Sequence, residues 1–183
     1  MRILILGSPG SGKSTLSRRL GAAAGIDPID LDDVAAMAYR TGRRPRPLEP
    51  LLSRSDQIAS TSSWIAEGVF TAWTEPLVEA ATTVVVLRTS LARCLWRVVR
   101  RHFARGFRNE HGGVRRLVTF CAEIVDYHLN ANPDEQWPDN PDRTTLAATM
   151  RLVSTVGDRL VVLDDRVQTE AFVVAIARLA GDA

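Results

Sequence analysis

Residues 7–14 form the segment that most restricts how this chain can fold. At every position the pattern G-x-x-x-x-G-K-[ST] is matched by GSPGSGKS. A short β-rich run at 2–6 precedes the segment, and a helix-compatible stretch at 14–24 follows it, with Leu16 and Leu20 on one face. This order predicts a phosphate-binding loop, because backbone N–H groups and the positive end of the helix then face the ligand. A glycine-rich turn without a ligand is the alternative.

Each part of this motif has a chemical role. Lys13 would bridge the outer phosphates of ATP, and the Ser14 hydroxyl would ligate Mg²⁺. Lys13 is also the single lysine of a chain whose other 22 basic residues are all arginine, which indicates that the compact ammonium group is required here. We expect the ATP site to include Gly7, Ser8, Pro9, Gly10, Ser11, Gly12, Lys13, Ser14 and Thr15.

The composition is that of one ordinary domain, residues 1–183. The net charge is +2 and 45% of the residues are hydrophobic, and a chain of this length buries roughly 70% of its surface on folding. No apolar run approaches the roughly 20 residues that cross a bilayer, and residues 1–6 are too few for a signal-peptide core. We therefore expect a cytoplasmic protein. Cys94 and Cys121 lack metal-ligand spacing and are expected to be buried free thiols.

Short β-rich runs alternate with helix-like stretches along the chain. This alternation predicts an α/β fold, because right-handed crossovers between such strands give a parallel sheet with helices on both faces. No internal repeat or linker divides the domain, and the polar stretch 130–143 is expected to be a loop or a surface insertion. The expected strands lie at 2–6, 28–31, 64–66, 82–87 and 160–163, and the last helix lies at about 169–179.

Acidic residues follow the second run, at the edge of a parallel sheet where ligands bind. This run ends in Asp30-Leu31-Asp32-Asp33, and the alternation of side chains along a strand puts Asp30 and Asp32 on the same face. Asp32 would then help to hold the metal or accept a proton from an acceptor hydroxyl. The alternative is that Asp32 or Asp33 caps the following helix.

The third run ends in a carboxylate and a glycine, Glu67 and Gly68. A carboxylate at this place is typical of the Walker B acid, which holds Mg²⁺ through water. Gly68 would let an acceptor approach the backbone closely. The alternative is a glutamate in a surface turn.

In this order, the motifs resemble the adenylate-kinase-like P-loop proteins known as topology modulation proteins. The likeness rests on the phosphate-binding loop, on IDLD at 29–32, on WIAEG at 64–68 and on LARCLWRVVRR at 91–101. It runs from residue 1 to about residue 108. The resemblance implies a P-loop NTPase three-layer sandwich with strand order 2-3-1-4-5 and an ATP site. It also implies a lid at about 101–116 and an acceptor-side segment at about 33–62.

The segment after the third run departs from the families that it resembles. Adenylate kinases carry Asp-Gly-Phe-Pro-Arg there, whereas this chain reads Glu67-Gly68-Val69-Phe70-Thr71. Thr71 stands in place of the arginine, which argues against AMP as the acceptor. The glycine triplet of shikimate kinases is also missing, which argues against shikimate.

Positive charge is concentrated between residues 91 and 116. This segment has eight arginines and one acidic residue, so it carries +7 and the remainder of the chain carries −5. Its first part is an amphipathic helix with one basic face. We interpret Arg93 and Arg97 as part of a solvated face of that helix.

The later arginines of this segment fit a lid. Gly106 and the pair Gly112-Gly113 provide hinges at both ends of a short segment. A lid that closes over ATP needs guanidinium groups to neutralise the transferring phosphoryl group. We assign this role to Arg101, Arg105 and Arg108, with a solvated basic helix face as the alternative.

The resemblance implies roles for three further arginines. Arg43 and Arg44 belong to a basic loop in the region that closes over the acceptor in the resembled fold, which predicts an anionic acceptor. A surface loop is the alternative. Arg166 follows the last strand, where related kinases hold the adenine against an apolar or arginine side chain.

The sequence therefore predicts an ATP- and Mg²⁺-dependent small-molecule kinase whose acceptor is not identified. The rival hypothesis is a nucleotide-gated nucleic-acid-binding protein without phosphotransferase activity, with the +7 segment as its footprint. We do not expect nucleic acid as a partner, because the chain has no helix-turn-helix or zinc signature and no aromatic interleaving for stacked bases. A GTPase is disfavoured because no N-K-x-D motif follows the fourth strand.

Overall fold

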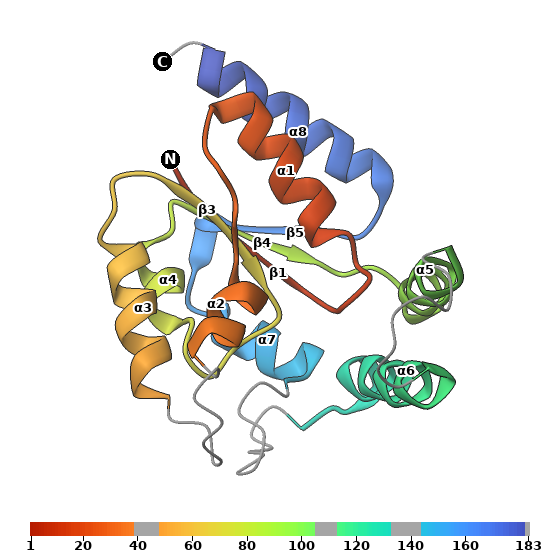
Figure 1. Ribbon diagram of the computed structural model, residues 1–183. Helices are drawn as coiled ribbons and strands as arrows, with labels where there is room; N and C mark the ends of the chain where they lie inside the picture. The colour runs from red at the N-terminus through yellow and green to blue at the C-terminus, as the bar shows by residue number, and fades with distance from the viewer. Residues whose placement is uncertain (39–47, 105–112, 133–143, 182–183) are drawn as a thin grey trace.

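A parallel sheet of five strands organises the computed structural model, which describes residues 1–38, 48–104, 113–132 and 144–181 (Figure 1). The strand order is β2-β3-β1-β4-β5, so the predicted order 2-3-1-4-5 is confirmed. The strands are β1 (Arg2–Gly7), β2 (Ile29–Asp30), β3 (Trp64–Gly68), β4 (Thr83–Leu87) and β5 (Leu160–Leu163). The helices are α1 (Lys13–Ala24), α2 (Leu31–Ala38), α3 (Glu49–Ala59), α4 (Glu75–Ala80), α5 (Leu91–Ala104), α6 (Gly113–Leu129), α7 (Leu146–Leu152) and α8 (Arg166–Gly181), with a 3₁₀ turn at Gly157–Arg159.

Successive side chains of β1 enter two different cores, because side chains of a strand alternate between the faces of its sheet. Ile3 and Ile5 pack with α1 and α8, whereas Leu4 and Leu6 pack with residues of α2, α3 and α4. All four are buried. Figure 1 shows the resulting layers, with α1 and α8 together on one face of the sheet and α3, α4 and α7 on the other. The predicted three-layer sandwich is confirmed.

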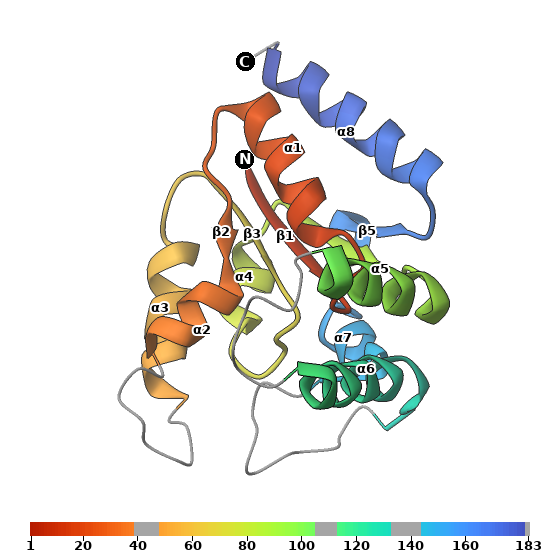
Figure 2. The ribbon, with the colours of Figure 1, turned by 45° about the vertical axis from the view of Figure 1, so that its right-hand side comes forward.

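A third, smaller core joins α5 to α6 beside the carboxyl ends of the strands (Figure 2). Cys94 and Val98 of α5 pack against Ile124 of α6, and all three are buried. Cys94 is a buried free thiol as expected, whereas Cys121 is partly exposed. None of the described helices is long and apolar enough to cross a membrane.

Two expected boundaries differ from the structure. The second strand was expected at 28–31 but consists of Ile29 and Asp30 alone, and α2 begins at Leu31. Asp32 therefore lies in the first turn of a helix, and the expectation that strand alternation aligns it with Asp30 is wrong. The cap of α2 is Asp30, whose Oδ1 accepts a hydrogen bond from Asp32 N at 2.8 Å.

The last helix begins three residues earlier than expected, at Arg166. Asp165 caps it, because its Oδ1 accepts a hydrogen bond from Gln168 N at 2.8 Å. The Gln168 side chain in turn accepts a hydrogen bond from Asp164 N at 2.7 Å. These two bonds fix the loop that leaves β5.

Gly68, at the end of β3, is required by packing. A Cβ atom at this position would lie 2.9 Å from Leu31 Cβ and 3.0 Å from Leu31 Cδ1. Leu31 is fully buried at the start of α2, so it has no room to move away. We expect Gly68→Ala to lower the free energy of unfolding by about 1–3 kcal/mol, measured by urea denaturation. In the control Gly181→Ala, whose Cβ would have no neighbour within 4 Å, stability should stay unchanged; equal losses in both variants would contradict the packing argument.

Candidate nucleotide and phosphoryl-transfer site

The loop between β1 and α1 is shaped by its glycines. Gly10 and Gly12 have φ angles of 79° and 109°, which side chains with a Cβ rarely adopt. Gly12 stands at the N-cap of α1, and no side chain caps this helix. The N-terminal N–H groups of α1 therefore point toward the loop without a side-chain acceptor, which is the arrangement that binds phosphate.

The Lys13 side chain folds back over the same loop. Its Nζ donates a hydrogen bond to the Ser8 carbonyl at 3.2 Å, and the residue is buried. Burial lowers the pKa of Lys13, while the charges of Glu67, Asp32 and Asp30 raise it. The structure thus brings one ammonium group and three carboxylates from β2, α2 and β3 to one place.

Glu67 lies at the centre of this group. It is buried within β3, in register with Ile5 of β1 and Asp30 of β2. Burial raises the pKa of Glu67, whereas a hydrogen bond with the Ser14 side chain and the charge of Lys13 lower it. The two residues that we expected to hold Mg²⁺, Ser14 and Glu67, are therefore side-chain neighbours.

Arg97 of α5 and the nearby Thr89 form hydrogen bonds with the backbone of the loop. Arg97 Nη1 donates hydrogen bonds to the carbonyls of Ser11 at 2.7 Å and Gly10 at 3.2 Å, and Thr89 Oγ1 donates to the Ser11 carbonyl at 3.0 Å. A Cβ on Gly10 would lie 2.7 Å from the Cys94 carbonyl, so only glycine lets α5 come this close. Arg97 is exposed, as expected for the solvated face of α5, and its guanidinium also fixes the loop backbone.

A cavity of about 300 Å³ lies in front of the loop. Three arginines from two helices line it together with Lys13 and Ser14. They are Arg18 of α1 and Arg97 and Arg101 of α5. Arg18 also donates a hydrogen bond from Nε to the Ser14 carbonyl at 2.7 Å. The cavity is strongly positive, which suits the phosphates of a nucleotide.

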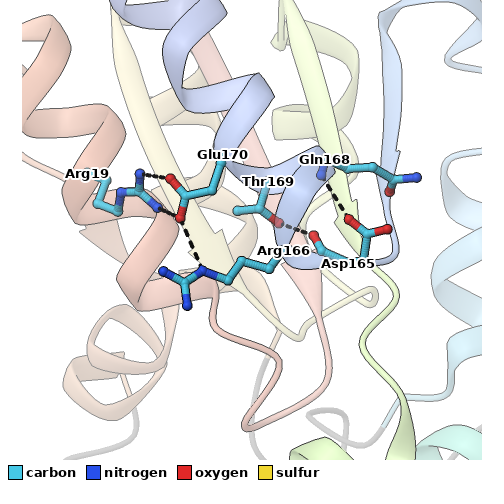
Figure 3. A network of polar contacts seen from close by, with 6 residues as sticks. All are labelled: Arg19, Asp165, Arg166, Gln168, Thr169 and Glu170. Atoms are coloured by element: carbon cyan, nitrogen blue, oxygen red, sulfur yellow. Dashed lines mark hydrogen bonds and ion pairs between the residues drawn. The ribbon is translucent and has the colours of Figure 1, made fainter.

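A second cavity of about 410 Å³ extends from Gly12 and Thr15 toward the start of α8. Figure 3 shows the polar network at its edge, in which Arg19 of α1 reaches across to Glu170 of α8. Arg19 Nη1 and Nη2 donate to the two Glu170 oxygens at 3.0 and 2.5 Å, and Arg166 Nε lies 3.6 Å from Glu170 Oε1. Arg166 and Arg93 both line this cavity. The position of Arg166 agrees with the place where we expected the adenine to bind.

The loop after β5 is held to the neighbouring strand by an ion pair. Arg88, directly after β4, donates from Nε and Nη2 to the two oxygens of Asp164 at 2.6 and 3.0 Å. Arg88 N also donates to the Leu163 carbonyl at 3.0 Å. Asp164 also lines the second cavity, so this ion pair fixes part of the cavity wall.

Several expected site residues need separate mention. Arg43, Arg44, Arg105 and Arg108 lie outside the described residues. Gly68 lies near the site, but Leu31 fills the space beside it. The roles that we expected for these residues stay predictions.

The sequence did not predict that Thr89 and Arg97 contact the loop. Thr89 could have been found, because it lies just after the fourth strand, at the edge of the sheet where ligands bind. Arg97 carried a weaker signal, its spacing of four residues from both Arg93 and Arg101, which places the three side chains along one side of α5.

The donor set fits a magnesium nucleotide. No group of three or more His, Cys, Asp or Glu side chains within the described ranges could hold a metal by itself. Mg²⁺ is usually held by one or two protein groups together with phosphate oxygens and water. Ser14, Glu67, the uncapped start of α1 and the positive cavity provide the protein part of such a site.

The comparisons with known proteins agree with this geometry. A family model described as an AAA domain matches residues 3–123. No curated protein matches the sequence.

Among solved structures, the gluconokinase from Sinorhizobium meliloti 1021 has a TM-score of 0.53 at 17% identity, over 99% of this chain and 94% of that one. The shikimate kinase from Bacteroides thetaiotaomicron has a TM-score of 0.55 at 16% identity, over 99% and 98% of the two chains. At such identities these likenesses show the fold alone. The expected resemblance to small adenylate-kinase-like P-loop kinases is confirmed at that level.

The burial of Glu67 has a measurable consequence for stability. Because its folded pKa lies above the ordinary value of 4.5, the unfolded state ionises first, and stability falls as the pH rises from about 4.5 through the folded pKa. We expect Glu67→Gln, in the presence of a chelator, to be more stable than the parent by about 1 kcal/mol near pH 7.5.

The difference should shrink as the pH falls through 4.5, because Glu67 then becomes protonated in the unfolded state as well. Urea denaturation at several pH values measures it, with the exposed Glu79→Gln as control. A variant that is less stable near pH 7.5, or a difference that does not depend on pH, would show that Glu67 is not destabilised by its burial.

Proposed function

This chain belongs to the AAA-domain family, and from its site we propose that it is an ATP-dependent phosphotransferase that acts on a small hydroxylated molecule. The observation that carries the proposal is the meeting of Lys13, Glu67 and Asp32 in front of the uncapped start of α1. Lys13 and α1 suit the phosphates, and Glu67 beside Ser14 suits the metal. Asp32 remains exposed, on the side where an acceptor would enter.

The names of the structural neighbours support this reading. The neighbours with the same fold include a gluconokinase and shikimate kinases, which are named for small hydroxylated substrates. The missing glycine triplet after β3 argues against shikimate as the acceptor of this chain, and Thr71 argues against AMP. The acceptor class that we propose is therefore a small hydroxylated metabolite that carries negative charge.

In the transfer step, the oxygen of the acceptor hydroxyl forms a bond to the γ-phosphorus of ATP, and the bond from that phosphorus to the β–γ bridging oxygen breaks. Asp32 accepts the hydroxyl proton. Lys13 and the N–H groups of α1 neutralise and orient the phosphates, and ADP is the leaving group. Mg²⁺, when bound, would be held by Ser14 and through water by Glu67, and would neutralise part of the phosphate charge.

Arginines complete the charge balance. Arg101 lines the phosphate cavity from the last turn of α5, a position suited to the transferring phosphoryl group. We propose that Arg105 and Arg108 continue this role in a lid, and that Arg166 contacts the base. On the acceptor side we propose Arg43, Arg44 and Gly68 beside Asp32.

The activity itself is tested by ADP release. Sugar acids, phosphorylated sugars and nucleoside monophosphates are offered one at a time with ATP and Mg²⁺, and ADP release above the acceptor-free rate identifies the acceptor class. A phosphorylated product confirms the transfer. A nucleotide hydrolysis rate that no hydroxylated compound raises would contradict the kinase proposal.

Lys13→Ala should abolish measurable transfer while the fold survives. Lys13 lines the cavity in front of the loop, so the loss of its ammonium group should raise the barrier by about 3 kcal/mol, roughly a hundredfold in rate. Circular dichroism and thermal unfolding check the fold, and the exposed Arg178→Ala on α8 serves as control. Unchanged turnover in Lys13→Ala would rule out the phosphate-binding role of this loop.

Asp32→Asn should depress acceptor turnover with nucleotide affinity retained. Loss of a general base typically lowers the rate by about a hundredfold or more. The matched control is Asp33→Asn, which changes the next residue of the same helix turn and is equally exposed. Turnover is measured with the acceptor found above, and ATP binding by calorimetry. Equal rates in both variants would leave Asp32 without a catalytic role.

A further inference from the structure

The outer face of α5 carries two exposed aromatic rings among its arginines. Trp96 is 59% exposed and Phe103 is 58% exposed, although large aromatic side chains are usually buried. The Arg100 guanidinium lies over the Trp96 ring, 5.2 Å from its centroid. The spacing of these three residues places them along one face of the helix. The structure thus places two exposed aromatic rings among the arginines of this helix.

This face differs from the face that serves the phosphate loop. Arg97 and Arg101 line the phosphate cavity, and Cys94 and Val98 pack against the rest of the protein. Trp96 and Phe103 are exposed and belong to none of the three buried clusters. Packing within the described parts of the chain thus gives no reason for an exposed tryptophan at position 96.

A hollow of about 540 Å³ lies beside the Trp96 ring. Its lining consists of Trp96 and three arginines, which are Arg93 and Arg97 of α5 and Arg166 of α8. No carboxylate lines it, and no carboxylate within the described ranges forms an ion pair with the four arginines of α5. Arg166 is paired with Glu170, which leaves Arg93 and Arg97 unneutralised within the described ranges. A flat ring beside these two guanidinium groups is complementary to a ligand that carries both an aromatic base and phosphates.

We propose that this outer face, formed by Arg93, Trp96, Arg100 and Phe103, binds single-stranded nucleic acid. An unpaired base stacks on Trp96 in the hollow, and neighbouring phosphates contact Arg93 and Arg100. A duplex does not fit this scheme, because its bases are already stacked on one another. An anionic membrane fits poorly too, because the apolar side of α5 is packed inside the protein.

This binding adds to the proposed phosphoryl transfer and does not depend on it. It is therefore measured without ATP, by fluorescence anisotropy of a labelled oligothymidylate of about 20 nucleotides, across salt concentrations of about 0.05 to 0.2 M. We expect Trp96→Ala to weaken binding by about 5- to 150-fold, because stacking on one aromatic ring accounts for that much affinity. Trp96→Phe keeps a ring and should retain most of the affinity.

Two control variants separate the surface from general effects. Leu129→Ala removes an apolar side chain of 69% exposure on α6, and Arg178→Ala removes an exposed arginine of α8; both should leave binding unchanged. Arg100→Ala should reduce the slope of log affinity against log salt by about 0.7, the value for one phosphate contact on a single strand. Thermal unfolding of each variant confirms that the fold is intact.

Three results would overturn the proposal. The first is the absence of binding at micromolar protein in low salt. The second is binding that Trp96→Ala leaves unchanged, or that a duplex of the same length matches, because both describe a charged surface without base stacking. The third is Trp96-dependent binding to phosphatidylserine vesicles with no binding to the oligonucleotide, which would identify a membrane surface instead.

Discussion

The arrangement of this site depends on how the loop between β1 and α1 uses its backbone. Other side chains satisfy the loop carbonyls: Lys13 bonds to Ser8, and Arg97 and Thr89 bond to Ser11. No side chain caps α1 at Gly12. The carbonyls are therefore turned outward into protein contacts, and the N–H groups at the start of α1 are left to face the phosphate cavity, so that the loop is preorganised for an anion.

Two charged groups of the site, Lys13 and Glu67, are buried beside this loop. Burial disfavours the charge of Lys13 and of Glu67, and each of these charges favours the other. For both residues burial outweighs the charge of the partner, so the pKa of Lys13 is lowered and the pKa of Glu67 is raised. A magnesium nucleotide would bring both negative phosphates and a divalent cation to this pair, so the site is expected to be most stable when it is loaded. The protein thus tolerates local instability at the place where the chemistry is proposed.

Much of the fold could be predicted because it follows from local sequence patterns. The phosphate-binding motif and its flanking segments predicted the positions of β1 and α1. The unbroken apolar run of β1 predicted a buried strand, and its side chains enter the cores on both faces of the sheet. The position of Asp32 could not be predicted from strand alternation. A two-residue strand is decided by its neighbours in the sheet, and Asp30 ends it by capping α2.

The contacts of Arg97 could not be predicted from the sequence, for a different reason. They depend on how closely α5 approaches the loop. That distance is set by Gly10, against which the Cys94 carbonyl packs. The close packing also determines where the outer face of α5 lies. Arg93, Arg97 and Arg166 line both the second cavity and the hollow beside Trp96, so a nucleotide in the one would change the charge that a nucleic acid in the other experiences. Helix α5 would then respond to both the nucleotide and the nucleic acid.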